Sequence, residues 1–375
     1  MLQCPLFQMG NPAVRLTFSL MFILLMQPFT FAFMKSIFWL FKGRLQRGHR
    51  WLIGITLFTV GNGLLALSMM RVWFGAFRLT AGWMVLLLFT LFTALATWLI
   101  WLSLRQTIEQ TRLSRGLRIF APLFLAGLFG LAVYNAYVPT VRHYAIQINK
   151  PLAQPIRIGM VSDLHLGKLF GSKQLDDLAN IMQREQVDMI LMPGDIMDDN
   201  TIAYEAENMQ PHLAKLRAPL GVYATLGNHD LFGAQEQITA AIQAAGITVL
   251  NDQAIEINGI NIIGRPDDLD KQRQATATLL KQVDTHKPVI LLDHRPSQIE
   301  QHAQLPIDIQ VSGHVHNGQV FPANLIVWAI NRVHYGYERI HNGHFFVTSG
   351  YGFWGVPFRL GSQSEVMIID VQGTP

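Results

Sequence analysis

The sequence predicts a chain of two parts, an all-α membrane region over residues 1–150 and an α/β domain over residues 151–375. The first observation is charge: the first part has 14 lysines and arginines and one acid, whereas the second has 15 basic and 24 acidic residues. The second is pattern, because long apolar runs fill the first part and short strands alternate with helices in the second. Basic residues between apolar runs indicate membrane topology, so we expect no nucleic-acid partner.

Four apolar runs in the first part are long enough to cross a bilayer as helices, which takes roughly 20 residues. They cover residues 16–34, 51–70, 81–102 and 119–138. Aromatic residues gather at their ends, and the runs are apolar all round rather than striped like helices of a soluble protein. The sequence therefore predicts four transmembrane helices with membrane lipids as partners.

The loops between these runs predict an orientation. Five basic residues follow the first run and four follow the third, whereas the loop after the second run has only Arg71 and Arg78. Basic loops stay in the cytoplasm. We therefore expect a multi-pass protein of the inner or plasma membrane, with the α/β domain on the extracytoplasmic side.

In the second part, most predicted strands end in polar residues. A linker is expected over 138–154, and helices over 203–216 and 270–283, among others. The polar motifs are Asp163-Leu164-His165, Gly194-Asp195-Ile196-Met197-Asp198, Gly227-Asn228-His229-Asp230, Asp293-His294 and Gly313-His314-Val315-His316. Strand carboxyl ends of an α/β sheet form its ligand crevice, so these residues are expected to meet at one edge. Each motif alone is weak, but five in one chain predict a catalytic metal site.

The five motifs in this order resemble the calcineurin-like metallophosphoesterases, in particular a membrane-associated bacterial branch. The last motif extends to Ser-Gly-His-x-His-x-Gly-Gln, from Ser312 to Gln319. The resemblance covers about residues 155–375. It implies a four-layer β-sandwich flanked by helices, where the strand pattern alone indicates only α/β. It also implies a metal-dependent phosphoric ester hydrolase.

By the same resemblance, two divalent ions are the cofactors. One would be held by Asp163, His165, Asp195 and His316, and the other by Asp195, Asn228, His294 and His314. Imidazole and oxygen ligands without a thiolate suit Mn, Fe or Zn.

The resemblance also assigns roles beside the ions. His229 would act on the leaving group, and Asp230 would orient it. Asp198 is either a partner of this site or a loop cap. Three basic residues are candidates for contact with substrate phosphate, although exposed solubilising charge is favoured for each: Lys168, Arg265 and Arg295.

Two questions stay open at this level. The apolar run 325–330 after the last motif is more typical of core packing, but it also fits a flap that accepts a lipid tail or enters the bilayer. The expected substrate is a phosphodiester or pyrophosphate of a lipid or cell-envelope compound. One alternative is the UDP-2,3-diacylglucosamine pyrophosphatase of lipid A biosynthesis. Another is a non-catalytic membrane sensor or transporter with a phosphoesterase-like domain.

Overall fold

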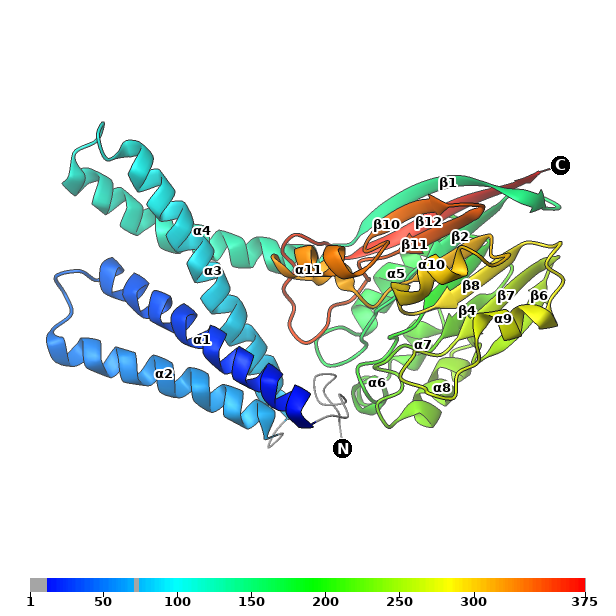
Figure 1. Ribbon diagram of the computed structural model, residues 1–375, viewed down its shortest axis with the longest axis horizontal. Helices are drawn as coiled ribbons and strands as arrows, with labels where there is room; N and C mark the ends of the chain where they lie inside the picture. The colour runs from blue at the N-terminus through cyan, green and yellow to red at the C-terminus, as the bar shows by residue number, and fades with distance from the viewer. Residues whose placement is uncertain (1–11, 71–73, 375) are drawn as a thin grey trace. The chain divides into compact units, whose positions relative to one another are not determined.

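The computed structural model describes residues 12–70 and 74–374, which form two compact units. The first unit extends to Ala132 and the second begins at Val133. Figure 1 shows long helices in the first unit and two sheets with shorter helices in the second.

Four long helices make up the first unit, except that the last turn of α4 belongs to the second: α1 (Pro12–Leu40), α2 (Arg47–Met69), α3 (Phe74–Leu104) and α4 (Gln110–Tyr137). Each contains a stretch that is long and apolar enough to cross a membrane. The polar side chains of Gln27 and Asn62 hydrogen-bond to each other at 3.0 Å, which links α1 to α2. The protein is therefore a membrane protein with four candidate spans, as its sequence predicts.

The second unit contains two six-stranded mixed sheets. The first has the order β1-β12-β2-β3-β4-β5, and the second β10-β11-β9-β8-β7-β6. The strands of the first sheet are β1 (Thr140–Pro151), β2 (Ile156–Met160), β3 (Met189–Pro193), β4 (Val222–Thr225), β5 (Thr248–Val249) and β12 (Glu365–Thr374). Those of the second are β6 (Gln253–Ile257), β7 (Ile260–Arg265), β8 (Val289–Asp293), β9 (Ile309–Ser312), β10 (Gly336–Ile340) and β11 (Gly343–Val347).

The sheets pack face to face through alternate residues of their strands. Ile158 and Met160 of β2 share one apolar cluster with Ile290 and Leu292 of β8. The outer face of the first sheet packs under α5 (Ser172–Arg184) and α8 (Gln235–Ala244). The outer face of the second packs under α9 (Thr276–Leu279), a short 3₁₀ turn and α10 (Ile299–His302). This helix–sheet–sheet–helix arrangement is the four-layer sandwich that the resemblance implied.

The expected linker over 138–154 is instead strand β1, which pairs in parallel with β12 at the edge of the first sheet. The expected helix over 203–216 is divided into α6 (Ile202–Ala206) and α7 (Gln210–Leu213). Asn208 has a φ of 48°, which ends α6, and Pro211 fits the first turn of α7 because an N–H there would have no partner within the helix.

Only the end of the expected helix over 270–283 is helical, as α9 and the 3₁₀ turn that follows. The backbone just before α9 forms hydrogen bonds with side chains from other segments. Gln274 donates its N–H to Asp252, and its carbonyl accepts from Arg265. Side chains thus take the bonds that a helix would have formed.

Candidate metal centre

Five strands, three from the first sheet and two from the second, deliver the predicted site residues to one edge of the sandwich. Asp163 and His165 follow β2, Asp195 follows β3, and Asn228 and His229 follow β4. The second sheet adds His294 directly after β8, and His314 and His316 after β9. The neighbours β2, β3 and β4 are parallel, as are β8 and β9, so their carboxyl ends point the same way.

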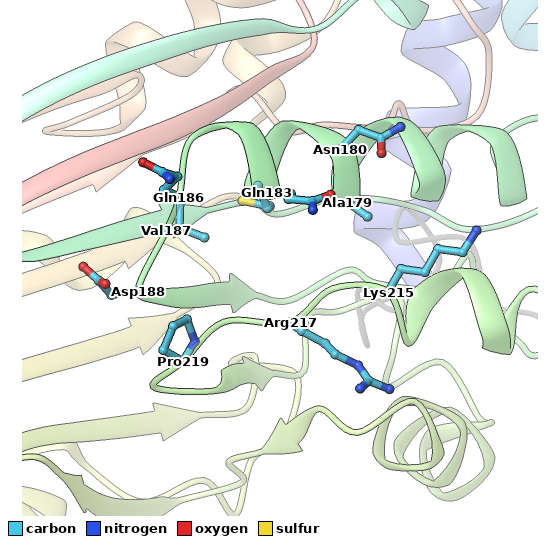
Figure 2. A pocket seen from close by; sticks show the side chains of 10 residues that line it. Ala179, Asn180, Gln183, Gln186, Val187, Asp188, Lys215, Arg217 and Pro219 are labelled. Atoms are coloured by element: carbon cyan, nitrogen blue, oxygen red, sulfur yellow. The ribbon is translucent and has the colours of Figure 1, made fainter.

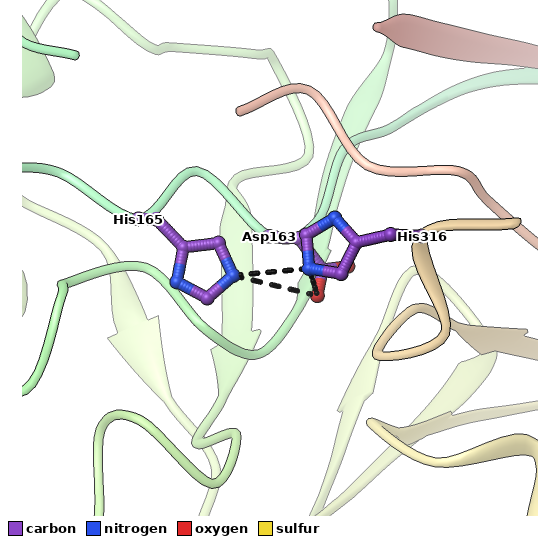
Figure 3. A group of neighbouring side chains, drawn as sticks. All are labelled: Asp163, His165 and His316. Atoms are coloured by element: carbon purple, nitrogen blue, oxygen red, sulfur yellow. Dashed lines mark hydrogen bonds and ion pairs between the residues drawn. The ribbon is translucent and has the colours of Figure 1, made fainter. Parts of the chain in front are cut away.

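Asp163, His165 and His316 form the first cluster, and all three are buried (Figure 3). The Nε2 atoms of His165 and His316 are 3.1 Å apart, and Asp163 Oδ1 lies 3.4 Å from His316 Nε2. Ligands held about 2.0–2.2 Å from a common ion stand at such separations from one another. The three side chains therefore converge as metal ligands do.

Asp195, His294 and His314 form the second cluster. His294 donates its Nδ1 proton to the carbonyl of Pro193 at 2.7 Å, which leaves Nε2 to face Asp195 Oδ2 at 3.1 Å. A backbone acceptor behind the ring fixes the tautomer that metal ligation needs. Asp195 Oδ2 is also 3.7 Å from His165 Nε2, so this carboxylate lies between the two clusters.

Asn228 supplies an amide oxygen to the same edge. Its Oδ1 is buried and has no hydrogen-bond partner within residues 12–70 and 74–374. The next residue is held close by, because the His229 N–H donates to Asp195 Oδ1 at 2.8 Å. A buried acceptor without a partner is costly unless a ligand satisfies it. The donor set and this oxygen fit divalent ions.

The backbone of the site adopts an uncommon conformation. Five of the seven predicted ligands have φ between 46° and 71°, in the left-handed region: Asp163, His165, Asp195, His314 and His316. Non-glycine residues with positive φ concentrate at functional sites, where surrounding structure holds them. Gly313 allows a close approach, because a Cβ there would collide with the Asp163 carboxylate.

The carboxylates give this edge a preference for positive charge. Burial lowers the pKa of His294, but Asp195 and Asp163 outweigh it and raise the pKa to about 10. Burial likewise opposes ionisation of Asp195, yet His294 and His229 hold its pKa well below the usual range. Burial and the neighbouring Asp195 raise the pKa of Asp163 to about 6. A bound divalent ion would satisfy these groups in place of a proton.

His229 is held by a residue other than the one expected. Its Nδ1 is 2.6 Å from Asp199 Oδ1, and both side chains are buried. Burial lowers the pKa of His229, but Asp195 and Asp199 outweigh it and raise the pKa to about 9. Asp230, expected to orient this ring, instead accepts N–H groups from Ile196, Met197 and Gly227.

Asp230 therefore holds the loops of the second and third motifs together, and its assignment as the orienting residue of His229 is wrong. Asp198 was expected to be either a partner of the site or a loop cap. One of its carboxylate oxygens lies 4.0 Å from Nδ1 of the predicted ligand His165, so it is close to the site without a short contact to that ring. The Gly-Asp motif gave no signal for Asp199, which is one position further along the chain.

The three basic candidates differ in surroundings. Arg265 is buried and bonds to Asp293, so it braces the strand end before His294. Arg295 is paired with Asp267 and Asp268 at 2.6 and 3.2 Å. Lys168 is exposed. Arg265 is thus a structural residue.

Arg359 is a residue that the motifs did not indicate. It is fully buried, donates Nη2 to the carbonyl of Ser349 at 2.7 Å, and places the same atom 3.1 Å from His316 Nδ1. It lies in an irregular segment before β12, and no motif includes it. It fixes the loop behind the first cluster.

A hollow elsewhere on this unit has a volume of about 630 Å³ (Figure 2). It is lined by the α5 helix and by segments that precede β3 and β4, including Asp188 and Arg217. These segments enter the amino ends of the strands, whereas the site residues follow the carboxyl ends. None of the predicted ligands lines this hollow.

A two-sheet α/β sandwich that gathers histidines, carboxylates and an amide at its strand ends defines the class of metal-dependent hydrolases. The calcineurin-like phosphoesterase family matches residues 156–318 of this chain. A metallophosphoesterase of Helicobacter pylori is 32% identical over 260 residues, which cover 67% of this chain and 69% of that protein. One of Aquifex aeolicus is 33% identical over 261 residues, covering 67% of this chain and 99% of that protein.

The chain therefore belongs to the calcineurin-like metallophosphoesterase family, and it is a metal-dependent phosphoester hydrolase. It is also 26% identical over 269 residues to a Bos taurus transmembrane protein with metallophosphoesterase domain, which covers 64% of this chain and 59% of that protein. The alternative of a non-catalytic sensor or transporter has no support in a domain that brings all its predicted ligands to one edge.

Proposed function

We propose that the protein is a membrane-anchored two-metal enzyme that hydrolyses phosphodiester or pyrophosphate bonds of lipid or cell-envelope substrates. The observation that carries this is the pair of ligand clusters with Asp195 between them. Asp163, His165 and His316 would hold one ion. Four further ligands complete the assignment, with Asp195 shared between the ions: Asp195, Asn228, His294 and His314.

The chemistry divides between the ions and the chain. When bound, two divalent ions lower the pKa of a bound water and neutralise charge on the phosphoryl oxygens. The buried 2.6 Å contact of Asp199 with Nδ1 favours the protonated form of His229. Its Nδ1 is committed to Asp199, so its Nε2 proton is available to the leaving oxygen. Asp199 thereby orients the acid.

The ligand atoms restrict the metal. Imidazole nitrogens, carboxylate oxygens and one amide oxygen suit Mn, Fe or Zn, and the chain's only cysteine, Cys4, lies outside the described residues and outside the catalytic unit's motifs. Metal analysis of the protein purified without chelator tests this. Two equivalents of these metals per chain are expected.

The distribution of basic residues among the loops between the spans supports a proposal for the membrane side. The proposal is a multi-pass protein of the inner or plasma membrane with its catalytic unit outside the cytoplasm. A reporter fused after Pro375 that works only outside the cytoplasm should be active. Activity of a cytoplasm-only reporter at this position would overturn the orientation.

Membrane attachment supports a lipid-linked substrate, and the net acidic catalytic half argues against nucleic acid. The test is hydrolysis by the full chain in detergent, supplied with Mn²⁺, of a model bis-ester, a model mono-ester, a phospholipid diester and the acylated UDP-sugar. We expect turnover of the bis-ester and of a lipid substrate.

Asp195→Asn should abolish this turnover, whereas Asp370→Asn should not. Asp370 serves as the control because it is a half-exposed carboxylate on β12, outside the five motifs, that forms an ion pair with Arg157. Absence of bound metal together with absence of turnover would refute the proposed function. Turnover confined to the acylated UDP-sugar would favour the lipid A step instead.

A further inference from the structure

The apolar segment after the last metal motif forms an exposed helix. Helix α11 covers Ala323–Ile330, and none of its side chains is buried. Leu325, Ile326, Trp328 and Ile330 are between 55% and 72% exposed. The expectation that this run packs into the core is therefore wrong. Exposed apolar side chains gathered in this way mark a contact surface for a protein, a ligand or a membrane.

Two hydrogen bonds connect the segment before this helix to the end of the last candidate membrane span. Phe321, two residues before α11, donates its N–H to the carbonyl of Leu360 at 2.7 Å. The adjacent carbonyl of Arg359 accepts from the Asn135 side chain at 3.2 Å. Asn135 lies in the last turn of α4, within the same compact unit. Figure 1 shows α11 on the side of this unit where α4 leads into β1.

The exposed side chain of Leu169 belongs to a loop that also contacts this end of α4. The Tyr137 hydroxyl donates to the carbonyl of Leu169 at 3.0 Å, and Leu169 is 41% exposed. Tyr137 also packs against Phe170 and Phe353. The loop after the first metal motif and the helix after the last one thus both lie beside the point where the chain leaves its final span.

We propose that α11, with Leu169, is a membrane-contact surface of the catalytic unit, and that its occupant is the interfacial layer of the bilayer that α1–α4 cross. Continuity with the end of α4 selects this occupant over a second copy of the chain. The helix is too short to span, because eight residues rise only about 12 Å. Its leucine, isoleucines and tryptophan suit a helix lying in the interface.

This contact would place the metal edge at the lipid headgroups. His314 and His316 precede α11 by fewer than ten residues, and Asp163 and His165 precede Leu169 by six and four. Both loops would be fixed against the surface in which a lipid phosphoester lies. The contact extends the proposed function, but it does not depend on the chemistry, and it can be measured without any substrate.

The test places a fluorescent probe on the full chain in vesicles. The sequence has one cysteine, so Cys4→Ser gives a cysteine-free parent. Ile326→Cys and, separately, Leu325→Cys then carry an NBD label on α11. Gln237→Cys, an exposed position on α8, is the matched control. The vesicles contain phosphatidylcholine and phosphatidylglycerol, with or without doxyl-labelled phosphatidylcholine.

We expect doxyl lipid to quench the label on α11 several-fold more than the label on α8. Aqueous iodide should instead quench the label on α8 more than the label on α11. A thermal midpoint equal to that of the cysteine-free parent shows that each labelled protein is folded. Equal quenching at the α11 and α8 positions would overturn the proposal. Shielding from iodide that appears only at high protein-to-lipid ratio, without doxyl quenching, would identify a second copy as the occupant and would also overturn it.

Discussion

Replacing Asp199 with asparagine should slow phosphoester hydrolysis while leaving the metal in place. Asp199 Oδ1 is 2.6 Å from His229 Nδ1 in a buried pair, so the bond is charge-assisted and little screened. Asparagine keeps the shape and an acceptor but removes the charge. A charge-assisted bond contributes about 1.5–3 kcal/mol, which corresponds to a roughly 10- to 150-fold lower turnover.

The assay is the turnover of a model bis-ester at saturating metal, with bound metal measured on the same samples. The control is a double-mutant cycle with His229→Ala, which should itself lower turnover by about 10²- to 10⁴-fold. If Asp199 acts through the imidazole, Asp199→Asn should cost little in the His229→Ala background. An equal loss in both backgrounds would refute the pairing, as would loss of metal from Asp199→Asn alone.

Three further predictions concern the metal, acid stability and the buried arginine. Asn228→Ala removes the unpartnered buried oxygen, so metal analysis should find about one ion per chain instead of two; unchanged content would contradict its role as a ligand. His302 is buried, and its Nδ1 proton is donated to Gln310 Oε1; burial lowers its pKa to about 4, so the unfolded chain binds a proton first as pH falls below about 6.5. Thermal unfolding should therefore show stability falling by up to about 1.4 kcal/mol per pH unit between pH 6.5 and 4, and His302→Gln should lessen this slope relative to wild type. Arg359→Met removes a buried donor from the Ser349 carbonyl, which should lower the free energy of unfolding by about 2–4 kcal/mol; an unchanged denaturation midpoint would contradict this.

The membrane helices and the strand ends were predictable because each leaves a strong local pattern. Apolar runs of the required length have few alternatives, and each of the four lies within a helix of the structure to within one residue at its end. The strands before the polar motifs were also correctly placed, since short apolar runs ending in glycine or carboxylate residues are typical of buried parallel strands. Strand β1 was missed because it is an edge strand whose exposed and buried residues alternate imperfectly.

The surroundings of the ligands were less predictable, because they depend on loop geometry. Asp198 and Asp199 are adjacent acids, and only the turn after β3 decides which one reaches His229. Asp230 is next to His229 in sequence, yet its carboxylate turns back to backbone N–H groups. Arg359 reaches the first cluster from an irregular segment more than 40 residues beyond His316, which no spacing rule connects.

Similar spacings lead to different partners in the two halves of the site, although the backbone conformation is the same in both. Asp163 and His165 are two residues apart, both have positive φ, and both face the same cluster with His316. His314 and His316 have the same spacing and also positive φ, yet they join different clusters. The two pairs approach the site from different sheets, because β2 belongs to the first sheet and β9 to the second. Asp195 links the two sheets at the site, because its Oδ2 lies close to His165 of the loop after β2 and to His294 after β8.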